Sequence, residues 1–313
     1  MDLIVGLDLG GTFLKSALGD TKGRLLQKAK RPSAATAPAD VIFDNMFAAV
    51  EELLGAAEQH GGVVRAIGVG SPGVIDVDRG RLVGQSPNLP HWADVEIAER
   101  MARHFGLPTF ADNDANLMTL AEVTVGAAKG CRHAVCLTVG TGIGGGLYLN
   151  GEIYRGSHFA GAELGHTLVE FDGRPCPCGG RGCLEQYASA PATVREYLAR
   201  LQEAGKSVPP EADAKLVFER AKAGEPEALA AVEVTSQYLG AGIASFANAL
   251  NPEMVVIGGG VADAGPFFID RVAQAVRERA MPTAWKGLKI RPAELGNDAG
   301  VIGAILLAAQ SVS

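Results

Sequence analysis

Three cysteines and a histidine lie close together near the middle of the chain. His166, Cys176, Cys178 and Cys183 follow the pattern H-x9-C-x-C-x4-C. Thiolate and imidazole ligands at such short spacing favour a tetrahedral Zn²⁺ ion, and four protein ligands would close its coordination shell. We therefore predict a structural zinc site. Free thiols and redox-active cysteines are the alternatives.

Two short glycine-rich stretches could hold phosphate groups. "DLGGT" (8–12) and "TVGTG" (138–142) each end an apolar run. Glycine lets the backbone approach a ligand closely, and successive N–H groups in such a turn can form an anion-binding site. A pair of these turns suits a polyphosphate such as ATP, whereas two plain β-turns without a ligand are the alternative. Asp8 closes the first apolar run and needs a partner, which a loop N–H or a Mg²⁺-bound water would supply.

The second stretch also fits a dinucleotide-binding motif. "GTGIGG" (140–145) matches G-x-G-x-x-G, but that motif requires a helix directly after it. Residues 146–156, "GLYLNGEIYRG", alternate in the manner of a strand instead. We therefore predict a glycine-rich hairpin here and no dinucleotide-binding fold.

Strands that alternate with helices must position these groups, which predicts an α/β fold. "VGLDLGGT" at 5–12 aligns with "VCLTVGTG" at 135–142, which indicates two related halves, each with its own glycine hairpin. The strands are expected within 3–11, 13–30, 65–73, 108–114, 133–156, 253–261 and 288–293. The helices are expected at 40–60, 93–105, 115–130, 191–204, 213–223, 226–250, 266–281 and 299–311.

Composition excludes some classes of function. The chain has 313 residues and a net charge of −7, so it lacks the basic balance typical of nucleic-acid binding. Its apolar runs are shorter than the roughly 20 residues that a membrane span needs. The N-terminus lacks the basic and small-residue features of a signal peptide. We expect a cytoplasmic protein that binds neither nucleic acid nor membrane.

The motifs together resemble the ROK family of sugar kinases, repressors and related open reading frames. The resemblance rests on "DLGGT", "GTGIGGG", "GAELGH" followed by "CPCGGRGCLE", and "IGGGVA", and it covers essentially the whole chain. It implies a two-lobed actin-like or hexokinase-like fold, a duplicated ribonuclease H-like α/β fold with a central cleft. We place the small lobe at 1–112 plus 300–313. The large lobe, which carries the zinc segment 165–185, is placed at 113–299.

The resemblance also implies roles for individual residues. Asp114 of "NDAN" is expected to be the general base. The expected substrate-binding residues are Asn88, Asn113, Asp114, Glu163, His166 and Glu185. The expected residues for the ATP phosphates, Mg²⁺ and adenosine are Asp8, Gly10, Gly11, Thr12, Thr138, Gly140, Thr141, Gly142, Gly258 and Gly259. His166 is expected to bind zinc with one ring nitrogen and to face the sugar with the other.

The function that the resemblance implies is ATP-dependent phosphorylation of a hexose at its 6-hydroxyl, with glucose as the favoured acceptor. An N-acylmannosamine kinase, an N-acetylglucosamine kinase or a broad hexokinase of the same family is the alternative. DNA-binding repressors of the family carry an extra domain before the first glycine turn, and Asp8 leaves no room for one. A sugar-binding protein without catalysis is disfavoured by the intact base and phosphate loops. A homodimer is expected by analogy with the family.

Overall fold

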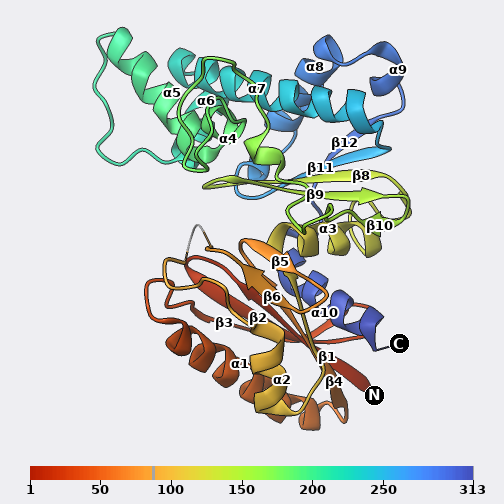
Figure 1. Ribbon diagram of the computed structural model, residues 1–313. Helices are drawn as coiled ribbons and strands as arrows, with labels where there is room; N and C mark the ends of the chain where they lie inside the picture. Colours follow the sequence, from red (N-terminus) through yellow and green to blue (C-terminus); the bar gives the residue numbers. More distant parts are fainter. Residues whose placement is uncertain (87–88, 313) are drawn as a thin grey trace. The chain divides into compact units, whose positions relative to one another are not determined.

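The structure is a computed structural model that describes residues 1–86 and 89–312. The chain divides into two compact units, which are coloured along the sequence in Figure 1. The first unit comprises Met1–Gly126, Ile153–Gly161 and Asn297–Ser313. The second comprises Ala127–Glu152 and Ala162–Gly296. Each unit is described by itself.

The first unit is built on a five-stranded sheet in the order β3-β2-β1-β4-β7. Neighbours β1, β2 and β3 are antiparallel, whereas β4 and β7 continue the sheet in parallel with β1. Its elements are β1 (Asp2–Leu9), β2 (Phe13–Asp20), β3 (Leu25–Pro32), α1 (Ala39–Gln59), β4 (Val63–Ser71), β5 (Val74–Asp76), β6 (Arg81–Val83), α2 (Ile97–Phe105), β7 (Thr109–Asn113), α3 (Asp114–Thr124), η3 (Gly296–Asp298) and α10 (Ala299–Ser311).

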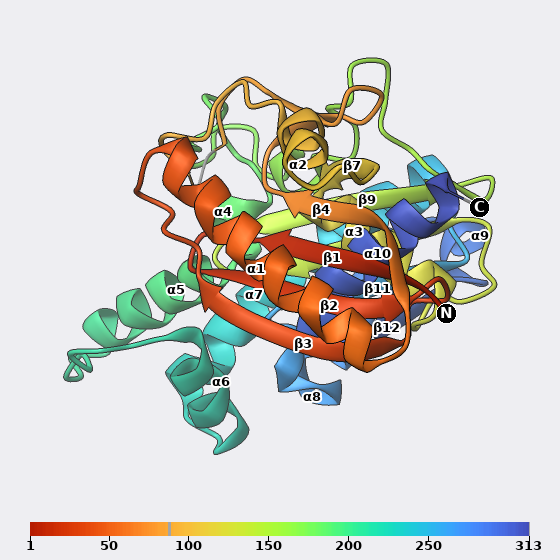
Figure 2. The ribbon, with the colours of Figure 1, turned by 90° about the horizontal axis from the view of Figure 1, so that it is seen from below.

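Successive side chains of β1 point to opposite faces of this sheet, and both faces are buried. Leu3, Val5 and Leu7 join the core beneath α1, whereas Ile4 joins a second core beneath α10. In Figure 2, α1 lies on one side of the sheet and α10 on the other. A strand that is buried on both faces is apolar at every position, which explains the continuous run "LIVGL".

The second unit has a sheet in the order β10-β9-β8-β11-β12. Strands β8 and β9 are antiparallel, and β11 and β12 continue in parallel with β8. Its core lies between this sheet and the long helix α7, on which α5, α6 and α8 pack. Its elements are β8 (Ala134–Val139), β9 (Ile143–Leu149), β10 (Glu152–Ile153), η1 (Leu164–His166), α4 (Glu185–Ala188), α5 (Ala190–Glu203), α6 (Ala214–Lys222), α7 (Pro226–Leu250), β11 (Met254–Gly258), η2 (Ala262–Ala264), α8 (Pro266–Arg279), α9 (Pro282–Trp285) and β12 (Lys289–Pro292).

The two sheets share one strand order. In each, an antiparallel hairpin, β1–β2 or β8–β9, leads into strands that run parallel to its first strand. The segments 5–12 and 135–142 thus occupy equivalent hairpins, as their alignment predicts. The α/β class and the duplicated fold are confirmed, and β9 follows "GTG" as the strand expected there.

Some boundaries differ from those expected. Helix α2 starts at Ile97 rather than at residue 93, because Ala93 forms a bridge with Gln85. The sequence predicts a lobe boundary at residue 112, whereas the first unit in the structure extends to Gly126, because α3 packs against α10. In the described part of the chain, helices that combine the length and the apolar character needed to cross a membrane are not found.

Candidate active site

The junction between β7 and α3 carries two carboxylates and an amide. Asn113 is the N-cap of α3, and its Oδ1 accepts hydrogen bonds from the N–H groups of Ala115 (2.9 Å) and Asn116 (3.2 Å). Asp114 is the first helical residue and is half-buried, and its Oδ1 accepts a bond from the Ala115 N–H at 2.9 Å. Because Asn113 already caps the helix, capping does not explain the acid at position 114.

Asp112 lies two residues earlier and is only 1% exposed. Its Oδ2 accepts hydrogen bonds from Arg155 Nε (3.0 Å) and Nη2 (2.6 Å). Its Oδ1 accepts bonds from the Asn113 N–H (2.7 Å) and from Asn116 Nδ2 (3.1 Å). Four donors thus engage this buried carboxylate and fix its orientation. Asp114 is the more exposed of the two carboxylates at this junction.

The first glycine turn is flanked by an ion pair. Asp8 and Lys15 face each other across β1 and β2, and Lys15 Nζ lies 3.3 Å from Asp8 Oδ2. The same ammonium group donates to the backbone oxygen of Asn297 at 3.1 Å. A Cβ atom on Gly300 would lie 2.5 Å from Asp8 Oδ2, so glycine is needed beside this carboxylate. Lys15 is not among the site residues predicted from the sequence, because its pairing with Asp8 depends on a strand register that the glycine turn leaves open.

The second glycine turn is held by Glu185. The Gly140 N–H donates to the Gly142 carbonyl at 2.9 Å and closes the turn. Glu185 Oε2 accepts a hydrogen bond from the Ile143 N–H at 2.9 Å, and a Cβ on Gly142 would lie 2.4 Å from this oxygen. By contrast, no described atom lies within 4 Å of a Cβ built on Gly140. The backbone of Gly140 thus borders open space, and that of Gly142 borders a carboxylate.

The predicted adenosine loop adjoins this turn. Gly258 ends β11 opposite Thr138 on β8. Gly259 has φ +82°, and a Cβ there would lie 2.4 Å from the carbonyl oxygen of Val139. The Val261 N–H donates to that carbonyl at 3.1 Å. The two loops therefore end neighbouring parallel strands at one edge of the second sheet, where ligands commonly bind in α/β folds.

The four predicted metal ligands come together in the second unit, with all ligand atoms within 4.8 Å of one another. Cys176 Sγ lies 3.6 Å from His166 Nδ1, and Cys178 Sγ lies 3.6 Å from Cys183 Sγ. Tetrahedral zinc with bonds of about 2.0–2.3 Å would separate its ligands by about 3.5–3.8 Å. The donor set and its spacing therefore fit zinc.

The thiols of the cluster differ in their surroundings. Burial raises the pKa of the Cys183 thiol to about 12, and the neighbouring thiols add to this effect. A hydrogen bond from the Gly180 backbone lowers the pKa of Cys178. A thiol must lose its proton to bind metal, and a divalent cation favours that loss strongly. Metal binding is thus expected to release protons from this cluster.

The segment before the cluster presents Glu163 and His166. Glu163 is exposed and directly precedes η1. A Cβ on Gly165 would lie 2.0 Å from the carbonyl oxygen of Ile143, so η1 packs closely on β9. His166 directs Nδ1 to Cys176, which leaves Nε2 as the ring nitrogen that can face a ligand. The predicted sugar contact Asn88 lies outside the described residues.

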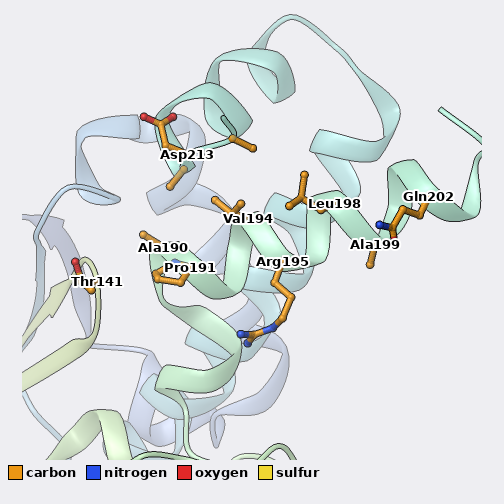
Figure 3. A pocket seen from close by; sticks show the side chains of 11 residues that line it. Thr141, Ala190, Pro191, Val194, Arg195, Leu198, Ala199, Gln202 and Asp213 are labelled. Carbon is orange, nitrogen blue, oxygen red and sulfur yellow. The ribbon is translucent and has the colours of Figure 1, made fainter. Parts of the chain in front are cut away.

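A pocket of about 650 Å³ opens beside the second glycine turn. Figure 3 shows Thr141 of the turn near Ala190 and Pro191, with Val194 and Leu198 farther along α5. The walls are mainly apolar, and the polar lining residues are Thr141, Arg195, Gln202 and Asp213. Sequence reasoning missed this pocket, because α5 reads as an ordinary amphipathic helix. An apolar pocket with a few polar groups is typical of sites for small molecules.

The chain is similar to known proteins over almost its whole length. The model of the ROK family matches residues 4–311. A glucokinase of Halalkalibacterium halodurans is 37% identical in an alignment of 307 positions that covers 96% of this chain and 92% of the relative. The crystal structure of a ROK family glucokinase from Streptomyces griseus with glucose and AMPPNP is 33% identical, with a TM-score of 0.83 and coverage of 98% of this chain and 99% of that chain. A ROK hexokinase from Thermus thermophilus is 36% identical, with a TM-score of 0.84 and coverage of 99% of both chains.

Proposed function

Because the chain belongs to the ROK family, we propose that it is an ATP-dependent sugar kinase that converts glucose to glucose 6-phosphate. The observation that carries this proposal is the β7–α3 junction. There Asp112 is engaged by four donors and Asn113 caps the helix, and a second, half-buried carboxylate, Asp114, follows at the first position of α3. Transfer of a phosphoryl group to a sugar hydroxyl requires a positioned group that accepts the hydroxyl proton, and Asp114 is our candidate.

The reaction proceeds in line. Asp114 accepts the proton of the sugar 6-hydroxyl as the oxygen attacks the γ-phosphorus of ATP. The new bond joins this oxygen to phosphorus, and the bond to the bridging oxygen of ADP breaks. Because the transferring group carries spread negative charge, most of the catalysis comes from positioning and electrostatic stabilisation.

The glycine turns at 10–12 and 140–142 bind the phosphates through backbone N–H groups. The Asp8 carboxylate would contact Mg²⁺, which would supply positive charge to the phosphates. Lys15 adds a cation at the same place. The adenine ring enters the apolar pocket along α5, next to Thr141, and Gly258 and Gly259 are the other proposed contacts of the adenosine.

The sugar hydroxyls are bound by Asn88, Asn113, Glu163, Glu185 and Nε2 of His166. Zinc on His166, Cys176, Cys178 and Cys183 is structural in this scheme. It fixes the tautomer and the ring orientation of His166, as metal ligation does generally. It also orders the chain that ends in Glu185, whose carboxylate meets the second glycine turn.

The identity of the sugar is tested by ADP release from MgATP with glucose, mannose, fructose, N-acetylglucosamine and N-acetylmannosamine. We expect the highest kcat/KM with glucose, and phosphorus NMR of the product should place the phosphate on the 6-oxygen. Turnover confined to an acylated amino sugar would keep the mechanism and refute glucose. We place the enzyme in the cytoplasm, where ATP is supplied, and a homodimer remains a prediction that sedimentation can test.

A further inference from the structure

One short segment interrupts the second unit. The chain enters the first unit at Ile153 and leaves it again after Gly161. Within this segment the Arg155 carbonyl accepts a hydrogen bond from the Gly161 N–H at 2.8 Å. A Cβ on Gly161 would lie 2.7 Å from the carbonyl carbon of Arg155, so only glycine allows this closure. The segment therefore closes on itself at Arg155.

Arg155 fixes this segment to β7 within the first unit. Its Nε and Nη2 both donate to Oδ2 of Asp112, which is buried. The two partners are 43 residues apart in the sequence. A guanidinium that engages one carboxylate with two N–H groups restrains orientation as well as distance.

The same carboxylate reaches the start of α3. Oδ1 of Asp112 accepts from the N–H of Asn113 and from Nδ2 of Asn116, which lie on either side of Asp114 in the sequence. Rotation of the Asp112 side chain would therefore disturb the backbone just before Asp114 and the first turn just after it. Arg155 supplies two of the four hydrogen bonds that restrain this rotation.

We propose that Arg155 is a positioning residue for the proton acceptor, acting through Asp112 on Asp114. This inference rests on the proposed function of Asp114. A shift of about 1 Å in a reacting group can cost about 100-fold in rate. Loss of Arg155 should thus lower kcat rather than substrate affinity, because Arg155 acts on the base and not on the bound sugar.

Removal of Arg155 alone also leaves a buried charge without its partner, which destabilises the fold. The test therefore uses three variants: Arg155→Met, Arg155→Lys, and the double variant Asp112→Asn with Arg155→Met. In the double variant the side-chain amide oxygen at position 112 can still accept the two bonds that Oδ1 of Asp112 accepts, and the buried charge is gone. Arg65→Met is the matched control, because Arg65 pairs with Asp2 at 2.6 Å on the surface.

We expect kcat to fall about 10- to 100-fold in Arg155→Met and in the double variant, with KM for glucose and MgATP within about threefold. Arg155→Lys should have a kcat between those of Arg155→Met and the parent. Its ammonium group keeps the positive charge beside Asp112 but lacks the planar pair of donors that fixes the carboxylate. The double variant should melt near the parent temperature yet stay slow, and Arg65→Met should match the parent in both. If both kcat and the melting temperature of the double variant returned to the parent values, the Arg155–Asp112 pair would serve stability alone, and the positioning role would be refuted.

Hydrogen exchange separates this inference from the proposed function. If the parent turns over no hexose, the proposed function fails. The amides of Asn113, Ala115 and Asn116 should still exchange faster in the double variant than in the parent, while amides of β1 stay unchanged. Unchanged exchange at the start of α3 would overturn the positioning role, whatever the activity of the parent.

Discussion

Asp112 and Asp114 are the same residue type, two positions apart, with different surroundings. Asp112 is 1% exposed and accepts bonds from Arg155, Asn116 and the Asn113 backbone. Asp114 is half-buried at the first position of α3. The same residue type thus has two different environments here, and in the proposed function Asp112 serves structure while Asp114 accepts the proton.

Gly140 offers a test of close ligand approach at a single residue. In Gly140→Ala the new methyl group enters open space, because no described atom lies within 4 Å of it and φ is not in the left-handed region. We expect an unchanged melting temperature but a raised KM for MgATP, since the methyl would meet only a bound phosphate. Steady-state kinetics with varied MgATP and a thermal melt check this. An unchanged KM for MgATP would contradict the assignment of the second glycine turn to phosphate binding.

Residues close in the sequence were predictable, and residues paired through the fold were not. The metal ligands follow from spacing, because short loops between ligands limit where their side chains can go. Arg155 was not predicted, because its partner Asp112 lies 43 residues away and only the fold brings them together. The pairing of Lys15 with Asp8 depends on the hairpin register, which a glycine turn of uncertain length leaves open.

At the scale of elements, the metal cluster joins two parts of the site. The described segment between η1 and α4 contains little regular structure. Two isolated β-bridges lie in it, Leu168 with Cys183 and Pro175 with Arg181. Such a segment has little core of its own, and a metal ion can supply the missing stability. Helix α4 then starts at Glu185, whose carboxylate accepts the Ile143 N–H. This short helix was not predicted, because four residues show no periodicity.

We expect about one zinc ion per chain in the parent, and less in Cys178→Ser, because closed structural sites need four ligands. Loss of zinc should lower the melting temperature and raise the KM for glucose, since Glu163, His166 and Glu185 flank the metal segment. Metal analysis, thermal melts and kinetics check this. Cys131→Ser is the matched control, because Cys131 lies outside the cluster. Equal zinc content in the two variants would contradict a metal centre at Cys178.

At the scale of the molecule, each unit repeats one sheet order, and the C-terminal helix completes the first unit. Helix α10 packs on β1 and β4 through close backbone contacts. A Cβ on Gly68 would lie 1.9 Å from the carbonyl oxygen of Ala304, and one on Gly303 would lie 2.0 Å from that of Leu117. The α/β class was predictable from alternating strands and helices. The extent of the first unit was not, because the packing of α3 on α10 leaves no local signal.

Gly68→Ala should lower the free energy of unfolding by about 1–3 kcal/mol, because overpacking forces the backbone of α10 away from β4. Gly55→Ala is the matched control in α1, where no described atom lies within 4 Å of the added Cβ. It should raise stability by about 0.5–1 kcal/mol, the usual gain for alanine in a helix interior. Urea denaturation of the two variants checks both signs. Equal stability of the two would contradict the packing of α10.

The central claim is that Asp114 accepts the proton of the sugar. The most direct measurement compares ADP formation from glucose and MgATP by the parent and by Asp114→Asn, with thermal melts of both proteins. We predict a fall in kcat of about 10²- to 10⁴-fold, the range for loss of a general base, with a melting temperature close to that of the parent because Asn113 keeps the cap. A variant that retains the parent's kcat would contradict the account.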